Sequence, residues 1–156
     1  MTKKYTYSKL NCTIRVYGLL IVQEHILFSE ETHQSMVINK FPGGGLQQGE
    51  GTIQCITREF KEELGIEISV RNHHYTTDFF QPAVFDPDIQ VLCIYYIVDP
   101  TANEKIFSVG GPSESFDHHD SEHKLYWKKC SELNVDDLTF PTDKAALALL
   151  LNQIQV

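Results

Sequence analysis

The sequence predicts a single α/β domain, built on a mixed β-sheet with flanking helices. Two observations carry this prediction: β-rich runs recur along the chain, and two helical segments lie among them, one amphipathic and one apolar. At 156 residues the chain is long enough to bury one core without disulfide or metal staples. We expect one domain over residues 1–156, with 1–11 as a loose N-terminal arm.

The first strands are expected to form a β-hairpin. Thr13–Val22 and Ile26–Phe28 are rich in β-formers, and Gln23-Glu24-His25 separates them. The polar residues 30–35 then predict a loop. Further strands are expected at 36–41, 66–71, 75–80, 89–98 and 125–129, with 102–109 as an additional candidate.

A helix is expected from about Thr52 to Leu64. Thr52 is a good N-cap residue, and Gly65 is suited to end the helix at positive φ, with Ile66 closing back on the last turn. The spacing i, i+3, i+7, i+11 places an apolar stripe on one face. Its members are Ile53, Ile56, Phe60 and Leu64.

The C-terminal half contains the most apolar segments. Ile89–Val98 is nearly continuously apolar, which suits a central strand covered on both faces. Residues 110–123 predict a loop long enough to suggest function or mobility. Pro141-Thr142-Asp143 opens the last helix, and its Ala145–Leu151 run is apolar all round. We expect this helix to be covered on more than one side.

Composition narrows the class of partner. The formal net charge is -8 and Lys and Arg together number 13, which disfavours a nucleic-acid polymer. A small anionic substrate remains open, because bound cations invert the local field. No apolar run approaches the roughly 18 residues of a membrane span. Because Met1–Leu10 is polar and does not resemble a signal peptide, we expect a cytoplasmic protein without membrane contact.

The cysteines give no sign of a cofactor. They are widely separated, and no C-x-x-C pair indicates zinc or redox chemistry. Buried free thiols are therefore expected at Cys12, Cys55, Cys93 and Cys130.

Three carboxylates share one side of the helix expected at 52–64. Glu59, Glu62 and Glu63 stand at i, i+3 and i+4, so at about 100° per residue they converge beside the apolar stripe. The three negative charges repel one another, so a nearby positive charge is needed to stabilise them. Mg2+ supplies one, with Mn2+ as the alternative, because both prefer oxygen ligands. Arg58 is expected to bridge to Glu62 at i+4, or to hold Glu50 if the loop folds back.

A glycine-rich turn precedes this helix. The run Phe41-Pro42-Gly43-Gly44-Gly45 permits close approach of main chain to a ligand. It is not a P-loop, because no Gly-Lys-Ser/Thr follows. Glu-x-x-Glu-Glu alone would most simply be a solvated acidic face. The adjoining glycine turn favours a metal site instead.

The turn and the helix together form a motif. The segment GGLQQGEGTIQCITREFKEELGI fits G-x5-E-x7-R-E-U-x-E-E-x-G-U, where U is apolar. Chance agreement at seven fixed residues is about one in 10^8. The segment from Gly44 to Ile66 covers 23 of the 156 residues and resembles the signature of the Nudix hydrolases at every fixed position. Many members carry an acidic residue where this chain has Gln47, a position that the pattern leaves free.

The resemblance implies an α/β/α sandwich in which a loop-helix-loop cradles a metal-bound diphosphate. The implied reaction is Mg2+-dependent hydrolysis of a phosphoanhydride in a nucleoside diphosphate linked to another group. The implied ligands are Glu59, Glu63 and the Gly43 carbonyl, with Glu62 as ligand or general base and Glu59 also catalytic. Arg58 and Glu50 are implied as supports behind the ligands.

A downstream loop offers rival groups for the base. In some family members the base comes from such a loop, which here contains Glu114, Asp117, Asp120 and Glu122. His118, His119 and His123 lie in the same stretch, but without fixed spacing they favour a solvated loop over a transition-metal site. In His73-His74, strand alternation should direct one side chain outward.

Aromatic residues beyond the motif are candidates to bind the substrate. Phe79, Phe80 and Phe85, with Tyr75, surround a loop that contains Pro82. Aromatic faces stack on nucleobases, although such residues more often form core. Pro82 falls sixteen residues after Ile66, a spacing that resembles ADP-ribose-hydrolysing members. This favours ADP-ribose or another nucleoside diphosphate sugar.

Two other functions stay open. One is a house-cleaning pyrophosphatase of nucleoside triphosphates, and the other is a Nudix-like nucleotide-binding or regulatory module without turnover. The intact motif favours an enzyme, because a pure binder does not need three unpaired carboxylates. A Ca2+-binding structural protein is remote, because the D-x-D-x-D-G loop is missing. Dimers are common among similar proteins, so a homodimer is also open.

Overall fold

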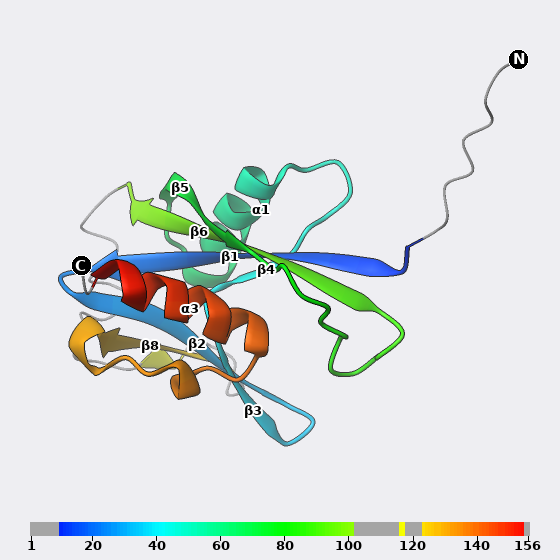
Figure 1. Cartoon of the computed structure of the whole chain (residues 1–156). Helices are drawn as coiled ribbons and strands as arrows, with labels where there is room; N and C mark the ends of the chain where they lie inside the picture. Colours follow the sequence, from blue (N-terminus) through cyan, green and yellow to red (C-terminus); the bar gives the residue numbers. More distant parts are fainter. Residues whose placement is uncertain (1–9, 102–115, 118–122, 155–156) are drawn as a thin grey trace, which may run out of the picture.

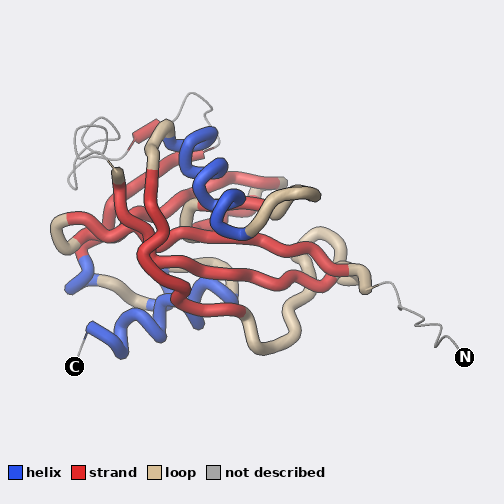
Figure 2. Tube along the Cα trace, turned by 90° about the horizontal axis from the view of Figure 1, so that it is seen from above, coloured by secondary structure: helices blue, strands red, loops and turns tan. Residues whose placement is uncertain are grey.

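The computed structural model describes residues 10–101, 116–117 and 123–154, and helices cover both faces of one mixed sheet (Figure 1). The strand order is β5-β6-β1-β2-β8-β7, with β3 paired to β2 and β4 paired to β1. Seen from above, helices α1 and α3 lie on opposite sides of the strands (Figure 2). The α/β/α sandwich expected from the sequence is confirmed.

The elements have the following bounds. The strands are β1 (Cys12–Val22), β2 (His25–His33), β3 (Met36–Lys40), β4 (Gly43–Gly45), β5 (Ile68–Thr76), β6 (Gln90–Pro100), β7 (Phe116–Asp117) and β8 (His123–Lys129). The helices are α1 (Thr52–Glu59), which continues into the π-helical turn η1 (Phe60–Leu64), and α3 (Pro141–Ile154). Short 3-10 turns η3 (Cys130–Glu132) and η4 (Val135–Asp137) precede α3.

Strand β6 occupies the central position expected for it, between β5 and β1. It runs parallel to β1, with Arg15 opposite Cys93 and Tyr17 opposite Tyr95. The β5–β6 and β1–β2 pairs are antiparallel, which makes the sheet mixed.

Strands β1 and β2 separate soon after their turn. They pair only at Ile21↔Ile26 and Val22↔His25. Beyond these pairs, β1 takes β4 as its neighbour and β2 takes β3. A wedge therefore opens between the two halves of the sheet, away from the turn.

The loop predicted at 30–35 was wrong. Glu30 to His33 continue β2 and pair with β3, and the chain reverses at Gln34 and Ser35, with φ of 48° and 67°. The first hairpin turns in the same way at Gln23 and Glu24, with φ of 47° and 62°, so His25 belongs to β2. Left-handed turn positions favour Gly or Asn, so neither turn carried its usual signal.

Two strands predicted at 66–71 and 75–80 are one strand, β5. Its register with β6 shifts between Val70 and Asn72 and again between His73 and Tyr75. Such irregularities break strict alternation, which made one strand resemble two. Residues 77–80 follow the strand as loop. As alternation predicted, His73 is exposed and His74 is buried.

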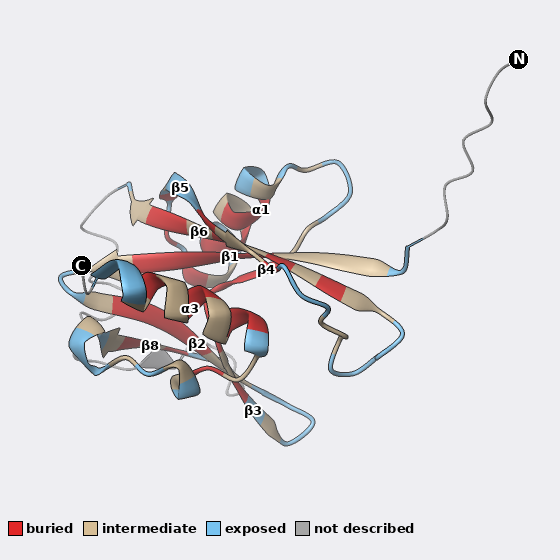
Figure 3. Ribbon diagram, viewed as in Figure 1, coloured by how far each residue is buried: buried red, intermediate tan, exposed pale blue. Residues whose placement is uncertain are grey.

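An apolar core lies on each face of the sheet (Figure 3). On one face, Ile56 and Phe60 pack against β1 residues such as Leu20. On the other, Leu147 of α3 packs against Tyr95 and its neighbours. Each helix is thus fixed by burial of one apolar face, which supplies most of the stability of short helices.

The start of α1 differs from prediction. Gly51, and not Thr52, is the N-cap residue, and its N–H donates to Gln54 Oε1 at 2.8 Å. The Thr52 hydroxyl instead bonds the Tyr96 hydroxyl at 2.7 Å. Ile53 is 54% exposed, because it lies in the first turn at the edge of the buried arc. The predicted end is confirmed, since Gly65 has φ of 65°.

Helix α3 is covered on one side and not all round. Its buried residues form one stripe, whereas the other apolar residues are half-buried and Ile154, at the end of the helix, is 52% exposed. The stripe consists of Thr142, Asp143, Ala146, Leu147 and Leu150.

The ionisable residue Asp143 lies in the first turn of α3 and is completely buried. The Tyr95 hydroxyl donates to its Oδ1 at 3.0 Å, whereas Oδ2 has no hydrogen-bond partner among the described residues. Burial raises the pKa of Asp143 to about 7. The protonated form therefore persists to near-neutral pH.

Some sequence expectations lie outside the described residues. These include the strand at 102–109 and most of the loop at 110–123, of which the structure describes only β7 and the start of β8. All four cysteines are free; Cys55 and Cys93 are buried, whereas Cys12 and Cys130 are half-buried. No described helix is long and apolar enough to cross a bilayer.

At Gly18 the backbone of β1 closely approaches Phe60 of the helical segment 52–64. A Cβ at this position would lie 2.6 Å from Phe60 Cε2 and 3.2 Å from Val98 Cγ2. We predict that Gly18→Ala lowers the free energy of unfolding by about 1–3 kcal/mol in urea titrations, as overpacked cores do. Gly45→Ala is the control, because a Cβ there meets nothing within 4 Å. Equal stabilities for the two variants would contradict this packing.

Asp143 should make stability depend on pH. The unfolded group titrates near 3.8 and the folded one near 7. Between these values only the unfolded chain releases the proton, so rising pH destabilises the wild type relative to Asp143→Asn, by at most about 1.4 kcal/mol per pH unit. Urea unfolding from pH 4 to 7 measures the difference. The exposed Asp136→Asn is the control, and a pH-independent difference for Asp143→Asn would refute the assignment.

Candidate active site

The glycine turn packs directly on the acidic helix. A Cβ on Gly44 would lie 2.4 Å from the Glu59 carboxyl carbon, so only glycine allows this carboxylate against the backbone. Gly43 has φ of 146°, and a Cβ there would lie 2.1 Å from the Val16 carbonyl oxygen. Both glycines pair with β1 as part of β4. The sheet thus holds the turn against Glu59.

Arg58 connects the loop, the turn and the helix. Its Nε and Nη2 donate to the two oxygens of Glu50 at 3.0 Å and 2.8 Å. Its Nη1 donates to Glu59 at 2.7 Å and to Glu62 at 3.1 Å, and Nη2 also reaches the Gly45 carbonyl at 3.2 Å. Both contacts predicted for Arg58, to Glu50 and to Glu62, are present. Hydrogen bonds from Arg58 lower the pKa of Glu50 to about 2.

The three glutamates of the helical segment have different surroundings. Glu59 is only 8% exposed, whereas the Glu62 side chain is 60% exposed. Glu63 is half-buried. Burial, followed by the nearby Glu59 and Glu31 carboxylates, raises the pKa of Glu63 to about 7, against the opposing charge of Lys40.

The expected convergence of all three carboxylates is not present. Within residues 10–101, 116–117 and 123–154, no three His, Cys, Asp or Glu side chains form a group that could hold a metal ion. Arg58 holds Glu62 on the outer side of the helix, while Glu63 lies beside Glu59. The close pair is therefore Glu59 and Glu63.

This pair fits a hard divalent cation by its chemistry. Two carboxyl groups lie together in a partly buried place, and burial, with the neighbouring carboxylates, raises the pKa of Glu63 to about 7. Added positive charge would favour the carboxylate form of both, and oxygen donors suit Mg2+ or Mn2+. Glu59 and Glu63 would hold the ion, with the Gly43 carbonyl on the adjoining turn.

A partly buried ion pair lies next to the acidic helix and was missed in the sequence. Lys40, at 6% exposure, ion-pairs with Glu31 at 2.7 Å. Both charges act on Glu63, so the pair lies near the carboxylates. Glu31 fell within the loop predicted at 30–35. The absence of Gly or Pro there was the available sign that β2 continues.

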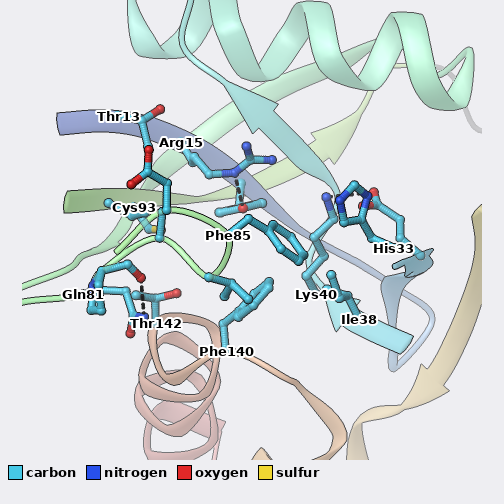
Figure 4. A pocket seen from close by; sticks show the side chains of 17 residues that line it. Thr13, Arg15, His33, Ile38, Lys40, Gln81, Phe85, Cys93, Phe140 and Thr142 are labelled. Atoms are coloured by element: carbon cyan, nitrogen blue, oxygen red, sulfur yellow. Dashed lines mark hydrogen bonds and ion pairs between the residues drawn. The ribbon is translucent and has the colours of Figure 1, made fainter. Parts of the chain in front are cut away.

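A cavity of about 330 Å³ occupies the wedge between β1 and β2. Its walls come from both of these strands, from β3, from β6, from residues 81–86 and from the start of α3 (Figure 4). Glu31 and Lys40 line it. They therefore stand between the cavity and the acidic helix.

Only part of the predicted aromatic set lies at this cavity. Pro82 and Phe85 line it, and the Phe85 ring lies 4.4 Å from the His33 ring, centroid to centroid. Phe79 and Phe80 do not line it and are 40% and 67% exposed. Pro82 is placed by a β-bridge to Gln90.

The remaining candidates lie elsewhere. Asp117 is in β7, opposite Lys124, and His123 begins β8. His74 bonds the Ala146 carbonyl at 2.8 Å beneath α3, away from the cavity lining. The residues outside the described ranges are Glu114, His118, His119, Asp120 and Glu122.

Comparison with known proteins agrees with this geometry. A model of the NUDIX domain matches residues 12–149. No curated protein matches the sequence significantly. The solved E. coli ORF135 protein is 18% identical over 93% of this chain and 92% of that chain, with a TM-score of 0.69. A NUDIX hydrolase from Nitrosomonas europaea is 17% identical over 93% and 90%, with a TM-score of 0.67.

A third solved structure, described as an ADP compounds hydrolase, is 15% identical over 92% of this chain and 73% of that chain, with a TM-score of 0.60. At these identities the likenesses show the fold, whereas the family model covers most of the chain. The chain therefore belongs to the Nudix family and is a hydrolase that acts on acid anhydrides in phosphorus-containing compounds.

Proposed function

We propose that the protein is a Mg2+-dependent pyrophosphohydrolase that cleaves a phosphoanhydride bond in a nucleoside diphosphate linked to a second group. One observation carries this proposal. The Glu59 and Glu63 pair lies against the glycine turn, and Lys40 and Glu31 join it to a cavity of about 330 Å³. A site for phosphates is thus next to a site of the size that small-molecule pockets have.

The roles follow from the surroundings of each group. Glu59 and Glu63 bind the cation with the Gly43 carbonyl, and Mn2+ is the alternative to Mg2+. When bound, such a cation would neutralise charge on phosphoryl oxygens and make a water molecule more acidic. Two groups are candidates to accept a proton from water: Glu59, which lies beside Glu63, and Glu62, which Arg58 holds on the outer side of the helix. Arg58 positions Glu59 while Glu50 fixes Arg58.

The second group is proposed to be a sugar. Pro82 and Phe85 line the cavity, and the spacing of Pro82 from the motif supports ADP-ribose or another nucleoside diphosphate sugar. The neighbouring ADP compounds hydrolase supports the same class. The cavity lining contains Phe85 and Phe140, whose faces suit a nucleobase.

Glu63→Gln tests the metal site. The amide keeps the shape of a group that is already neutral below about pH 7, so the fold should persist, but it removes a charged ligand. We predict at least an about 100-fold loss of kcat with Mg2+, measured as phosphate-containing product released from the best substrate. Circular dichroism and urea unfolding verify the fold.

Glu67→Gln is the matched control, because Glu67 is exposed and forms only a long ion pair of 3.9 Å, with the exposed Lys61, among the described residues. It should retain wild-type turnover. A folded Glu63→Gln variant with wild-type turnover would remove Glu63 from the site.

A substrate panel tests the reaction itself. We predict that the wild type with Mg2+ or Mn2+ hydrolyses nucleoside diphosphate sugars, ADP-ribose among them, with higher kcat/KM than the nucleoside triphosphate of the same base. Higher kcat/KM for triphosphates would indicate a house-cleaning pyrophosphatase. An inert protein across the panel with both metals would indicate a binding module.

A further inference from the structure

Arg15 is a fixed guanidinium inside the cavity. It lies on β1 and points into the space that Phe85 also enters (Figure 4). Its Nε donates to the Tyr17 hydroxyl at 2.7 Å, and its Cζ lies 5.7 Å from the centroid of the Tyr17 ring. Tyr17 is 3% exposed and stacks on Tyr95 at 5.4 Å. The core thus holds the guanidinium in place.

The outer edge of this guanidinium is available to a ligand. Nη1 and Nη2 donate to no acceptor in the described part of the chain, and no carboxylate there forms an ion pair with Arg15. Arg15 is half-buried, and its side chain lines the cavity. A planar, preorganised fork with free donors suits a ligand that presents two adjacent acceptors.

The charges of the cavity favour a neutral ligand group over an anion. Arg15 and Lys40 contribute two positive charges, and Glu31 and Asp86 contribute two negative ones. The cavity lining therefore has no excess positive charge, and it is not suited to bind a phosphate or carboxylate in addition to the diphosphate at the Glu59 and Glu63 site.

The walls favour a flat ring. Phe85 and His33 stand at one side with ring centroids 4.4 Å apart, and Phe140 and Ile38 add apolar surface. Aromatic and apolar walls around one hydrogen-bonding group are typical of nucleobase pockets.

We propose that Arg15 determines base specificity and selects guanine, by donating from both terminal nitrogens to guanine O6 and N7. This deepens the proposed function and rests on it for the nucleotide class. Guanine presents two adjacent acceptors on this edge, whereas adenine presents N7 beside the N6 amino donor. A guanidinium has only donors. With adenine, one of its terminal nitrogens would therefore face the N6 amino group, which is also a donor, and would lack an acceptor. Within the nucleoside diphosphate sugars, Arg15 thus points away from the adenine that the Pro82 spacing favoured.

Equilibrium binding tests the proposal without turnover. Isothermal calorimetry with GMP and AMP, without metal, should give about 10-fold to 100-fold tighter binding of GMP to the wild type. Arg15→Met should bring the two affinities within about 3-fold. Arg15→Lys should do the same, because lysine keeps the charge but lacks the fork. Arg71→Met is the control, since Arg71 is exposed and pairs with Asp99 on β6.

Retention of the full GMP preference in a folded Arg15→Met variant would overturn the proposal, as would equal binding of GMP and AMP by the wild type. Turnover supplies a second arm with the sugar held constant. Wild-type kcat/KM for GDP-glucose should exceed that for ADP-glucose by about 10-fold or more, and Arg15→Met should remove the difference. Absence of any turnover would refute the proposed function alone, because the binding arm still measures Arg15.

A third arm separates the base from the sugar as the source of acceptors. UDP-glucose and UDP-glucuronate share a base and differ by one carboxylate. Similar kcat/KM for the two would support the base as the partner of Arg15. A strong preference for the glucuronate that disappears in Arg15→Met would instead place the second group on Arg15 and overturn the assignment to guanine.

Discussion

The divergence of β1 and β2 is the constraint on which the rest of the site depends. Because the two strands pair at only two positions, each needs a new partner farther along, and β4 and β3 fill these places. The chain between them crosses the wedge at Phe41 and Pro42, and the Gly18 N–H bonds the Pro42 carbonyl at 2.9 Å. Lys40 thus lies on one half of the sheet and the glycine turn on the other, with the cavity alongside.

The acidic residues in and around the helical segment 52–64 differ in how well nearby positive charges compensate them. Arg58 satisfies Glu50 on both oxygens and keeps Glu62 at the surface, so these carboxylates are compensated. Glu63 is less compensated, because Lys40 is also paired with Glu31. A bound cation would offset such negative charge and let an acidic site accept a phosphate-rich ligand. In this site the uncompensated negative charge is concentrated at Glu59 and Glu63.

Sequence reasoning succeeded where local chemistry determines the structure. The helix at 52–64, its end at Gly65 and the contacts of Arg58 follow from propensity, glycine and spacing. It failed where tertiary contacts decide. Glu31 and Lys40 were missed because Gln34 and Ser35 turn the chain in left-handed conformations without the usual residues. Arg15 lies in a predicted strand and was not predicted as a site residue. Its role depends on the contact with Tyr17 and on the separation of β1 from β2, and neither can be inferred from the local sequence.

The acidic helix and the cavity depend on different faces of the sheet. Sequence changes at one of them can therefore leave the other intact as the family diverges. The acidic helix is anchored in one core, while the walls of the cavity come largely from the other face and from the β2–β3 hairpin. Residues lost or gained at the hairpin tip would reshape the opening beside His33 without disturbing the packing of Phe60. New ligand preferences can therefore arise by drift at the rim while the hydrolytic apparatus stays intact.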